Sequence, residues 1–170
     1  MKRLFFIIAA MLLIAAPASA QQQQSKVRAI FLLQFARYAT WPVEENDQSF
    51  VMTVVGSDDV ASELRTITRG KTIKGRTIDI VTSTSARNLP KSDVIYLGEE
   101  FADKTQKVID DQYGRRTLVV GSKEGMCEQG AQVALTEEGN KIGFEWSKRN
   151  VDRGGVRVNP KVLLMGKELN

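Results

Sequence analysis

The amino-acid sequence predicts an α/β fold, a sandwich with a mostly parallel central sheet, flanking helices and an antiparallel C-terminal hairpin. Short runs of β-branched and apolar residues alternate with segments in which apolar residues recur every three or four positions. Such alternation is typical of strands joined by helices, and hence of a parallel sheet. Two apolar segments at 132–135 and 141–145 flank a turn that contains Gly139-Asn140, which predicts the hairpin.

The first 20 residues are predicted to be a leader that is not part of the fold. Lys2 and Arg3 precede an apolar run over 4–16, which is short for a membrane span, and the small residues at 18–20 have the pattern of a signal-peptide cleavage site. We therefore expect export and cleavage after Ala20. An uncleaved anchor helix is the alternative.

The rest of the chain has the length of one ordinary domain. We expect 21–25 to be a flexible, glutamine-rich N-terminus and 26–170 to be a single α/β domain. The whole chain has 24 basic and 20 acidic residues, a net charge of +4, which falls to +2 when the leader is removed. Because cations and anions alternate along the sequence, it predicts no nucleic-acid partner.

The first element of the domain is an amphipathic helix over 26–39, ended by Trp41-Pro42 because the residue before a proline disfavours helical geometry. The apolar run 50–55 predicts a central strand buried on both faces. A turn follows it, where Ser57 or Asp58 caps the next helix. The later elements are a helix at 60–70, strands at 77–81 and 93–98, a helix at 99–112, a strand at 117–121, the hairpin, and a helix opened by Asn159-Pro160.

The residue inventory excludes several kinds of chemistry. The chain has no histidine and one cysteine, Cys127, so Cys/His zinc sites and Ser-His-Asp or Cys-His catalytic groups cannot be built. Pairs of acidic residues fall in predicted loops and at helix ends, where carboxylates are solvated and need not converge in a cleft. We therefore expect no catalytic residues, no metal and no cofactor.

Cys127 has two interpretations. Glu124 and Glu128 are of the wrong sign to activate a thiol, so this residue is expected to be a small buried apolar side chain. The alternative is a disulfide between two chains, because an exported protein meets an oxidising compartment and a lone thiol has no internal partner.

Two places in the sequence could bind other molecules. Gly56-Ser57, Gly98 and Gly121 follow successive predicted strands, and open α/β sheets bind small ligands at that edge. The aromatic residues Phe35, Tyr38 and Trp41 gather at the end of the first helix. They either form an exposed ridge for a partner or pack this helix on the sheet.

Three segments of the chain resemble the YfiR family of periplasmic proteins. The segment 26–42 is similar to the phenylalanine-rich opening helix of that family with its closing Trp-Pro. The segment 70–78 has the pattern Gly-Lys-x-x-x-Gly-x-x-Ile, and the strand at 93–97 follows it. The third segment, 142–145 with 155–163, is similar to the family's last strand and helix.

The resemblance implies a periplasmic regulator that is not an enzyme. Proteins of this type restrain an inner-membrane diguanylate cyclase, and so control cyclic-di-GMP and biofilm, until envelope stress or an outer-membrane lipoprotein relieves the restraint. The best-studied type forms homodimers and has paired cysteines, whereas this chain has only Cys127. Related domains accompany sensor kinases, so a small-ligand-binding module that partners a histidine kinase is the alternative. For the partner surface we expect Arg37, Trp41 and Arg157.

Overall fold

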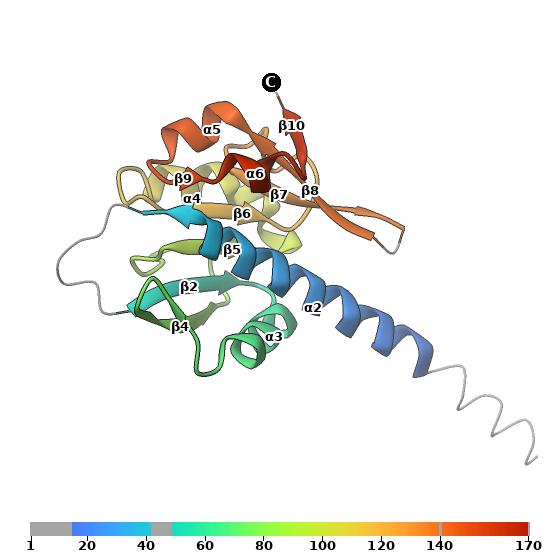
Figure 1. The fold of residues 1–170 in the computed structure, drawn as a ribbon. Helices are drawn as coiled ribbons and strands as arrows, with labels where there is room; N and C mark the ends of the chain where they lie inside the picture. The colour runs from blue at the N-terminus through green and yellow to red at the C-terminus, as the bar shows by residue number, and fades with distance from the viewer. Residues whose placement is uncertain (1–14, 42–48, 140, 170) are drawn as a thin grey trace, which may run out of the picture.

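The computed structural model describes residues 15–41, 49–139 and 141–169, and gives no side-chain detail before residue 21 (Figure 1). The elements that form the fold are, in order, α2 (Ala15–Tyr38), β1 (Ala39–Thr40), β2 (Ser49–Val55), α3 (Asp58–Thr68), β3 (Thr72–Ile73), β4 (Arg76–Ser83), β5 (Val94–Leu97), the 3₁₀ helix η1 (Glu99–Lys104), α4 (Thr105–Asp111), β6 (Leu118–Gly121), β7 (Val133–Glu138), β8 (Lys141–Ser147), α5 (Lys148–Arg153), β9 (Arg157–Val158), α6 (Pro160–Leu163) and β10 (Lys167–Leu169).

One sheet of eight strands forms the middle of the molecule, in the order β10-β8-β7-β6-β5-β2-β4-β3. The strands from β7 to β4 are parallel, as are β8 and β10, whereas the pairs β7–β8 and β3–β4 are antiparallel. The α/β class, the mostly parallel sheet and the C-terminal hairpin are thus confirmed. Strands β1 and β9 form a separate antiparallel pair.

Helix α2 begins at Ala15, well before residue 26, where we expected the helix to start. Residues 21–25, which we expected to be flexible, are helical because their polar side chains have partners elsewhere in the fold. Gln24 donates a hydrogen bond to Glu137 of β7, and Ser25 donates one to Asp59 of α3. These long-range hydrogen bonds fix the segment to the rest of the fold, although its glutamine-rich composition gives no indication of such contacts.

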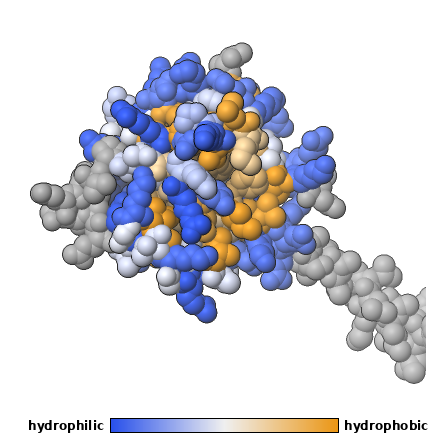
Figure 2. All heavy atoms as spheres, in the orientation of Figure 1, coloured by the Kyte–Doolittle hydropathy of each residue, from blue (hydrophilic) through white to orange (hydrophobic). Residues whose placement is uncertain are grey.

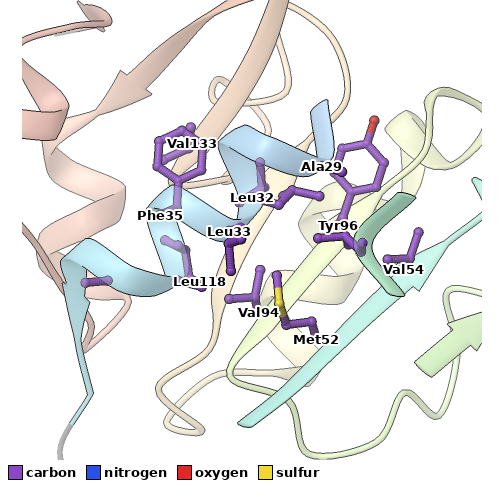
Figure 3. Packing of buried hydrophobic residues seen from close by; sticks show 14 of the residues in the cluster. Ala29, Leu32, Leu33, Phe35, Met52, Val54, Val94, Tyr96, Leu118 and Val133 are labelled. Carbon is purple, nitrogen blue, oxygen red and sulfur yellow. The ribbon is translucent and has the colours of Figure 1, made fainter. Parts of the chain in front are cut away.

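The larger part of the hydrophobic core lies between α2, α3 and one face of the sheet. Figure 3 shows side chains of α2, including Leu32, Leu33 and Phe35, facing side chains of β2, β5, β6 and β7. Phe35 also meets Phe144 of β8 edge to face, with ring centroids 5.1 Å apart. The expectation that α2 packs on the sheet through its aromatic residues is therefore confirmed for Phe35.

The opposite face of the sheet is covered by η1, α4 and the loop that precedes β7. The segment expected as one helix over 99–112 is divided into 3₁₀ helix η1 and α-helix α4. This second core consists mostly of small and branched residues: Val55, Ala86, Leu89, Ile95, Leu97, Ala102, Val108, Val119, Met126, Cys127, Ala131 and Ala134.

Asp93 connects several elements where β5 and β6 begin. Its two carboxylate oxygens accept one hydrogen bond each from Arg76, both 2.8 Å long, and one of them also accepts from the Val51 N–H. Its backbone carbonyl accepts from the Leu118 N–H and from the indole N–H of Trp41. The Arg76 guanidinium also lies 5.2 Å from the centre of the Phe50 ring.

The Gly-Lys-x-x-x-Gly segment supports this arrangement. Lys74 and Gly75 both have positive φ, as a two-residue hairpin between β3 and β4 requires. The turn places Arg76 at the start of β4, beside Asp93, and the Lys74 ammonium donates to the Ala39 carbonyl after α2. The motif is therefore structural in this chain.

Breaking the Arg76–Asp93 pair should destabilise the protein strongly, because both side chains are almost buried (13% and 12% exposed). We expect Arg76→Ala to lower the free energy of unfolding by about 3 kcal/mol, since it leaves an uncompensated carboxylate. Urea denaturation measures this. Lys107→Ala, which removes an exposed pair with Asp111, is the control and should change it by less than about 0.5 kcal/mol.

Candidate partner-binding groove

An open groove with a volume of about 1050 Å³ lies between the β1–β9 pair, α5, α6 and β10. These short elements pack together near the end of β8 (Figure 1). The register of β1 with β9 sets Thr40 opposite Arg157, which brings the end of α2 to the C-terminal part of the chain. The apolar residues that line the groove are Trp41, Trp146, Val151, Val156, Val158, Pro160, Leu163 and Leu164.

Two large apolar side chains stand exposed at the end of α6. Leu164 is 83% exposed and Met165 is 77% exposed, whereas Leu163 beside them is buried. Figure 2 shows that hydrophobic side chains also reach the surface over the middle of α2 and beside it, on the same side of the molecule. Leu164 lines the groove and Met165 follows it directly, and exposed apolar side chains at a groove are typical of an interaction site. The apolar surface over α2 lies outside the groove lining.

The charges in the groove are only partly paired. Lys148 and Asp152 form an ion pair of 2.9 Å within α5, and the hydrogen bond from Lys148 to Asp152 raises the pKa of the lysine. Arg157 and Glu168 also line the groove but form no ion pair within the described part of the chain. An incoming carboxylate could therefore pair with Arg157 without displacing an internal partner.

The structure brings together two of the three residues expected at the partner surface. Trp41 and Arg157 both line the groove, whereas Arg37 is exposed on the last turn of α2, outside its lining. Trp41 is only 6% exposed, and its ring packs edge to face on Phe50 at 5.0 Å. Most of Trp41 thus belongs to the core, and only its groove-facing part is within reach of a partner. Tyr38 is half exposed.

Sequence reasoning missed the residues that give the groove its apolar character. Trp146 and Met165 were assigned no role, and Leu164 was expected only as part of the helix opened by Asn159-Pro160. A signal was present in the run Val162-Leu163-Leu164-Met165, because a helix this short cannot bury four successive apolar side chains.

Cys127 is 3% exposed and lies in the second core. Burial raises the pKa of its thiol to about 12, and the nearby carboxylate of Glu145 adds to this effect. The expectation of a small buried residue agrees with this placement. A disulfide to another chain would require the loop around Cys127 to open first, because folded protomers cannot bring a second sulfur to a buried one.

At the edge of the sheet that was the alternative binding place, for a small ligand, the glycine positions are filled by the chain's own residues. A Cβ at Gly56 would lie 2.5 Å from the Phe101 ring, and one at Gly121 would lie 2.6 Å from the side chain of Met126. A Cβ at Gly98 would lie 2.5 Å from the Gly56 carbonyl. These glycines therefore permit close packing and leave no open crevice at their own positions.

The first half of α2 covers the same edge with polar contacts. Arg28 donates to the Ser122 carbonyl at 2.6 Å and to Glu137 at 2.9 Å. Burial of Asp59 alone would raise the pKa of its carboxyl, but hydrogen bonds from Ser25, Ser57 and the Val60 N–H outweigh it and lower the pKa. Ser57 precedes α3 as expected, but its hydroxyl bonds to Asp59 and caps no backbone N–H.

Neither a metal centre nor a membrane span is found in the described ranges. No three potential ligand side chains cluster among residues 15–41, 49–139 and 141–169. Within the same ranges, no helix combines the length and the apolar character needed to cross a bilayer.

Residues 25–167 match the sequence model of a family described as YfiR/HmsC-like. Proteins of this family are periplasmic regulators associated with cyclic-di-GMP signalling and are not enzymes.

Two solved structures share the fold. A "conserved domain protein" from Vibrio cholerae O1 biovar eltor strain N16961 has a TM-score of 0.51 and 16% identity, over 71% of this chain and 55% of that one. An "ABC domain in complex with L-Trp" from Streptococcus pneumoniae has a TM-score of 0.57 and 10% identity, over 84% of this chain and 62% of that one. The chain thus spans little more than half of either protein, and the likeness is one of fold alone.

The thiol of Cys127 should react only when the protein opens. At pH 8 we expect negligible alkylation of the folded protein and rapid alkylation in urea, measured by mass spectrometry. The folded thiol stays protonated to about pH 12, whereas the unfolded thiol ionises near 9.0. The stability of the wild type relative to Cys127→Ala should therefore be constant below pH 9 and fall above it. Rapid alkylation of the folded protein would contradict the burial.

Proposed function

Because the chain belongs to the YfiR/HmsC-like family, we propose that it binds the periplasmic part of an inner-membrane diguanylate cyclase and holds that enzyme inactive. In this way it would limit cyclic-di-GMP and biofilm formation. The observation that supports a binding role is the groove, whose lining includes the exposed Leu164 and also Arg157, which forms no ion pair with the residues that the structure describes. Met165 is also exposed and directly follows Leu164. We assign the partner contact to this groove.

The groove suits a partner segment that carries an apolar side chain beside a carboxylate. The apolar side chain would enter between Trp41 and Trp146, and the carboxylate would pair with Arg157. Burying Leu164 and Met165 in the complex would contribute about 2 kcal/mol each. Restraint further requires that the groove bind the inactive conformation of the enzyme more tightly than the active one, since equal affinity shifts no equilibrium.

Relief of the restraint would follow from competition for the same surface. An outer-membrane lipoprotein that covers the groove would release the membrane enzyme without any chemical change in this protein. The homodimer implied by the family resemblance remains a prediction, and the buried Cys127 makes a non-covalent dimer the simpler form.

Deleting the gene should raise cellular cyclic-di-GMP, and restoring the wild-type protein should lower it again. We expect the double variant Leu164→Ser/Met165→Ser to fold but to fail to restore the low level. Ile30→Ser, which changes an exposed apolar residue outside the groove lining, is the matched control and should complement fully.

The cyclic-di-GMP assay has two outcomes that would contradict the proposal. An unchanged level in the deletion strain under several envelope stresses would exclude a brake on a cyclase. Full complementation by the double variant would exclude the groove as the contact, even if the deletion phenotype is present.

A small-ligand sensor that partners a histidine kinase is the second candidate. It is favoured by the fold likeness to a domain whose structure holds L-Trp, and by a groove large enough for a metabolite. The glycines at the sheet edge are closely packed by other residues of the chain, so such a ligand would have to bind in the groove.

A bound metabolite should raise the thermal midpoint by mass action. In a panel of amino acids and other metabolites at millimolar concentration, a shift of several degrees that Leu164→Trp abolishes would support this candidate, because Leu164 is an exposed residue of the groove lining and a larger side chain there would obstruct the groove. The absence of any shift would exclude it for the compounds tested.

A further inference from the structure

Five exposed arginines gather where β5 and β6 begin, and we call this surface the basic edge: Arg87, Arg115, Arg116, Arg149 and Arg153. Arg115 and Arg116 directly precede β6. Helix α5, with Arg149 and Arg153, directly follows β8. Because β8 runs antiparallel to β7, it ends at the edge where the parallel strands start.

The arginines of the basic edge are neighbours in space. Arg87 and Arg115 line one cavity of about 380 Å³. Arg149 and Arg153 line another of about 490 Å³, together with Tyr113 of the α4–β6 loop. The side chain of Arg116 lies within 3.4 Å of the place that a Cβ on Gly155 would take, just after α5.

These five guanidinium groups form no ion pair within the described part of the chain. Asp110 and Glu128 line the same cavity as Arg149 and Arg153, but Asp110 accepts from Gln106 instead. Arg149 and Arg153 are also one helical turn apart, a spacing at which like charges repel. The five arginines and Lys107 outnumber Asp110, Asp111 and Glu128, the acidic residues that line the two cavities, so the surface is suited to an anionic partner.

The opposite edge of the sheet has the opposite sign. Acidic residues follow the carboxyl ends of the parallel strands: Asp58 and Asp59 after β2, Glu99 and Glu100 after β5, Glu124 after β6, and Glu137 and Glu138 at the end of β7. Three of these acidic residues, Glu99, Glu124 and Glu137, form ion pairs with lysine or arginine at the same edge, so this edge is less strongly charged than the basic edge.

An aromatic side chain projects from the basic edge. Tyr113 is 83% exposed at the tip of the α4–β6 loop, and none of its atoms forms a side-chain hydrogen bond within the described residues. Tyrosine is enriched at the level of lipid head groups, where its ring is partly dehydrated and its hydroxyl stays wet. Clusters of four to eight cations bind anionic lipids when they lie beside a transmembrane helix or on an amphipathic helix. The basic edge presents a cluster of this size on a folded domain.

We propose that the basic edge binds an anionic phospholipid surface, with the arginines at the phosphate groups and Tyr113 at the head-group level. The cations are spread over two loops and one helix around shallow cavities, and they are not focused in one deep pocket. That arrangement favours contact with several lipid head groups at once over the binding of one anchor side chain of a protein partner. The proposal does not depend on the cyclase assignment, because protein and lipid alone are enough to test it.

The test is sedimentation of the purified protein with vesicles of phosphatidylcholine, with or without phosphatidylglycerol. We expect binding only to the vesicles that contain phosphatidylglycerol, and loss of binding between about 0.05 and 0.5 M salt. Arg115→Glu/Arg116→Glu should weaken binding at least about tenfold. Lys26→Glu/Lys141→Glu makes the same change of charge at the acidic edge and should leave binding almost unchanged, and thermal denaturation checks the folding of both variants.

Three outcomes would overturn the proposal. They are no sedimentation with phosphatidylglycerol vesicles at low salt, equal binding to pure phosphatidylcholine, and equal weakening by the two variants. If the protein ignores vesicles but Arg115→Glu/Arg116→Glu abolishes its capture of a membrane protein, the basic edge recognises an acidic protein surface and the lipid proposal is wrong.

Discussion

The arrangement around Asp93 determines where the ends of five elements meet. One carboxylate joins β4 through Arg76 and β2 through the Val51 N–H, while the backbone of the same residue joins β6 and the indole of Trp41. Because Trp41 follows α2 and β1 directly, its position also sets that of β9 and hence one wall of the groove. The Arg76–Asp93 ion pair therefore helps to fix the shape of the groove, although neither residue lines it.

The sheet was predictable because its central strands β2, β5 and β6 are continuous apolar runs that are almost entirely buried. The run 50–55 needs only its composition to be recognised, and it forms β2, which lies inside the parallel group between β5 and β4. Strands β3, β9 and β10 have two or three residues each, too few to show any periodicity. They form because neighbouring segments already position them, and two of them, β9 and β10, contribute to the lining of the groove.

Individual residues show the same limit. Cys127 was predicted as a buried apolar side chain because its neighbours in the sequence are unfavourable to a thiolate, which is local information. The orientation of Trp41 was harder to predict, because an aromatic residue at a helix end can face either the core or the solvent. The hydrogen bond from its indole N–H to the Asp93 carbonyl fixes its orientation in the fold. The distribution of charge over the folded surface could not be predicted from the sequence. Cations and anions alternate along the chain, and the fold separates them by placing loops at opposite ends of parallel strands.

The contacts of α2 have a consequence for the order in which the chain can fold. Arg28 lies 94 residues before Ser122 and 109 before Glu137, so the first helix of the domain waits for the last third of the chain to complete its surroundings. A chain that emerges from its N-terminus cannot cover Phe35 completely until β7 and β8 are made, because this side chain packs on both strands. Such a nascent chain exposes apolar surface to which a holdase chaperone can bind. Its folding would be completed only after the C-terminal third has been synthesised and released.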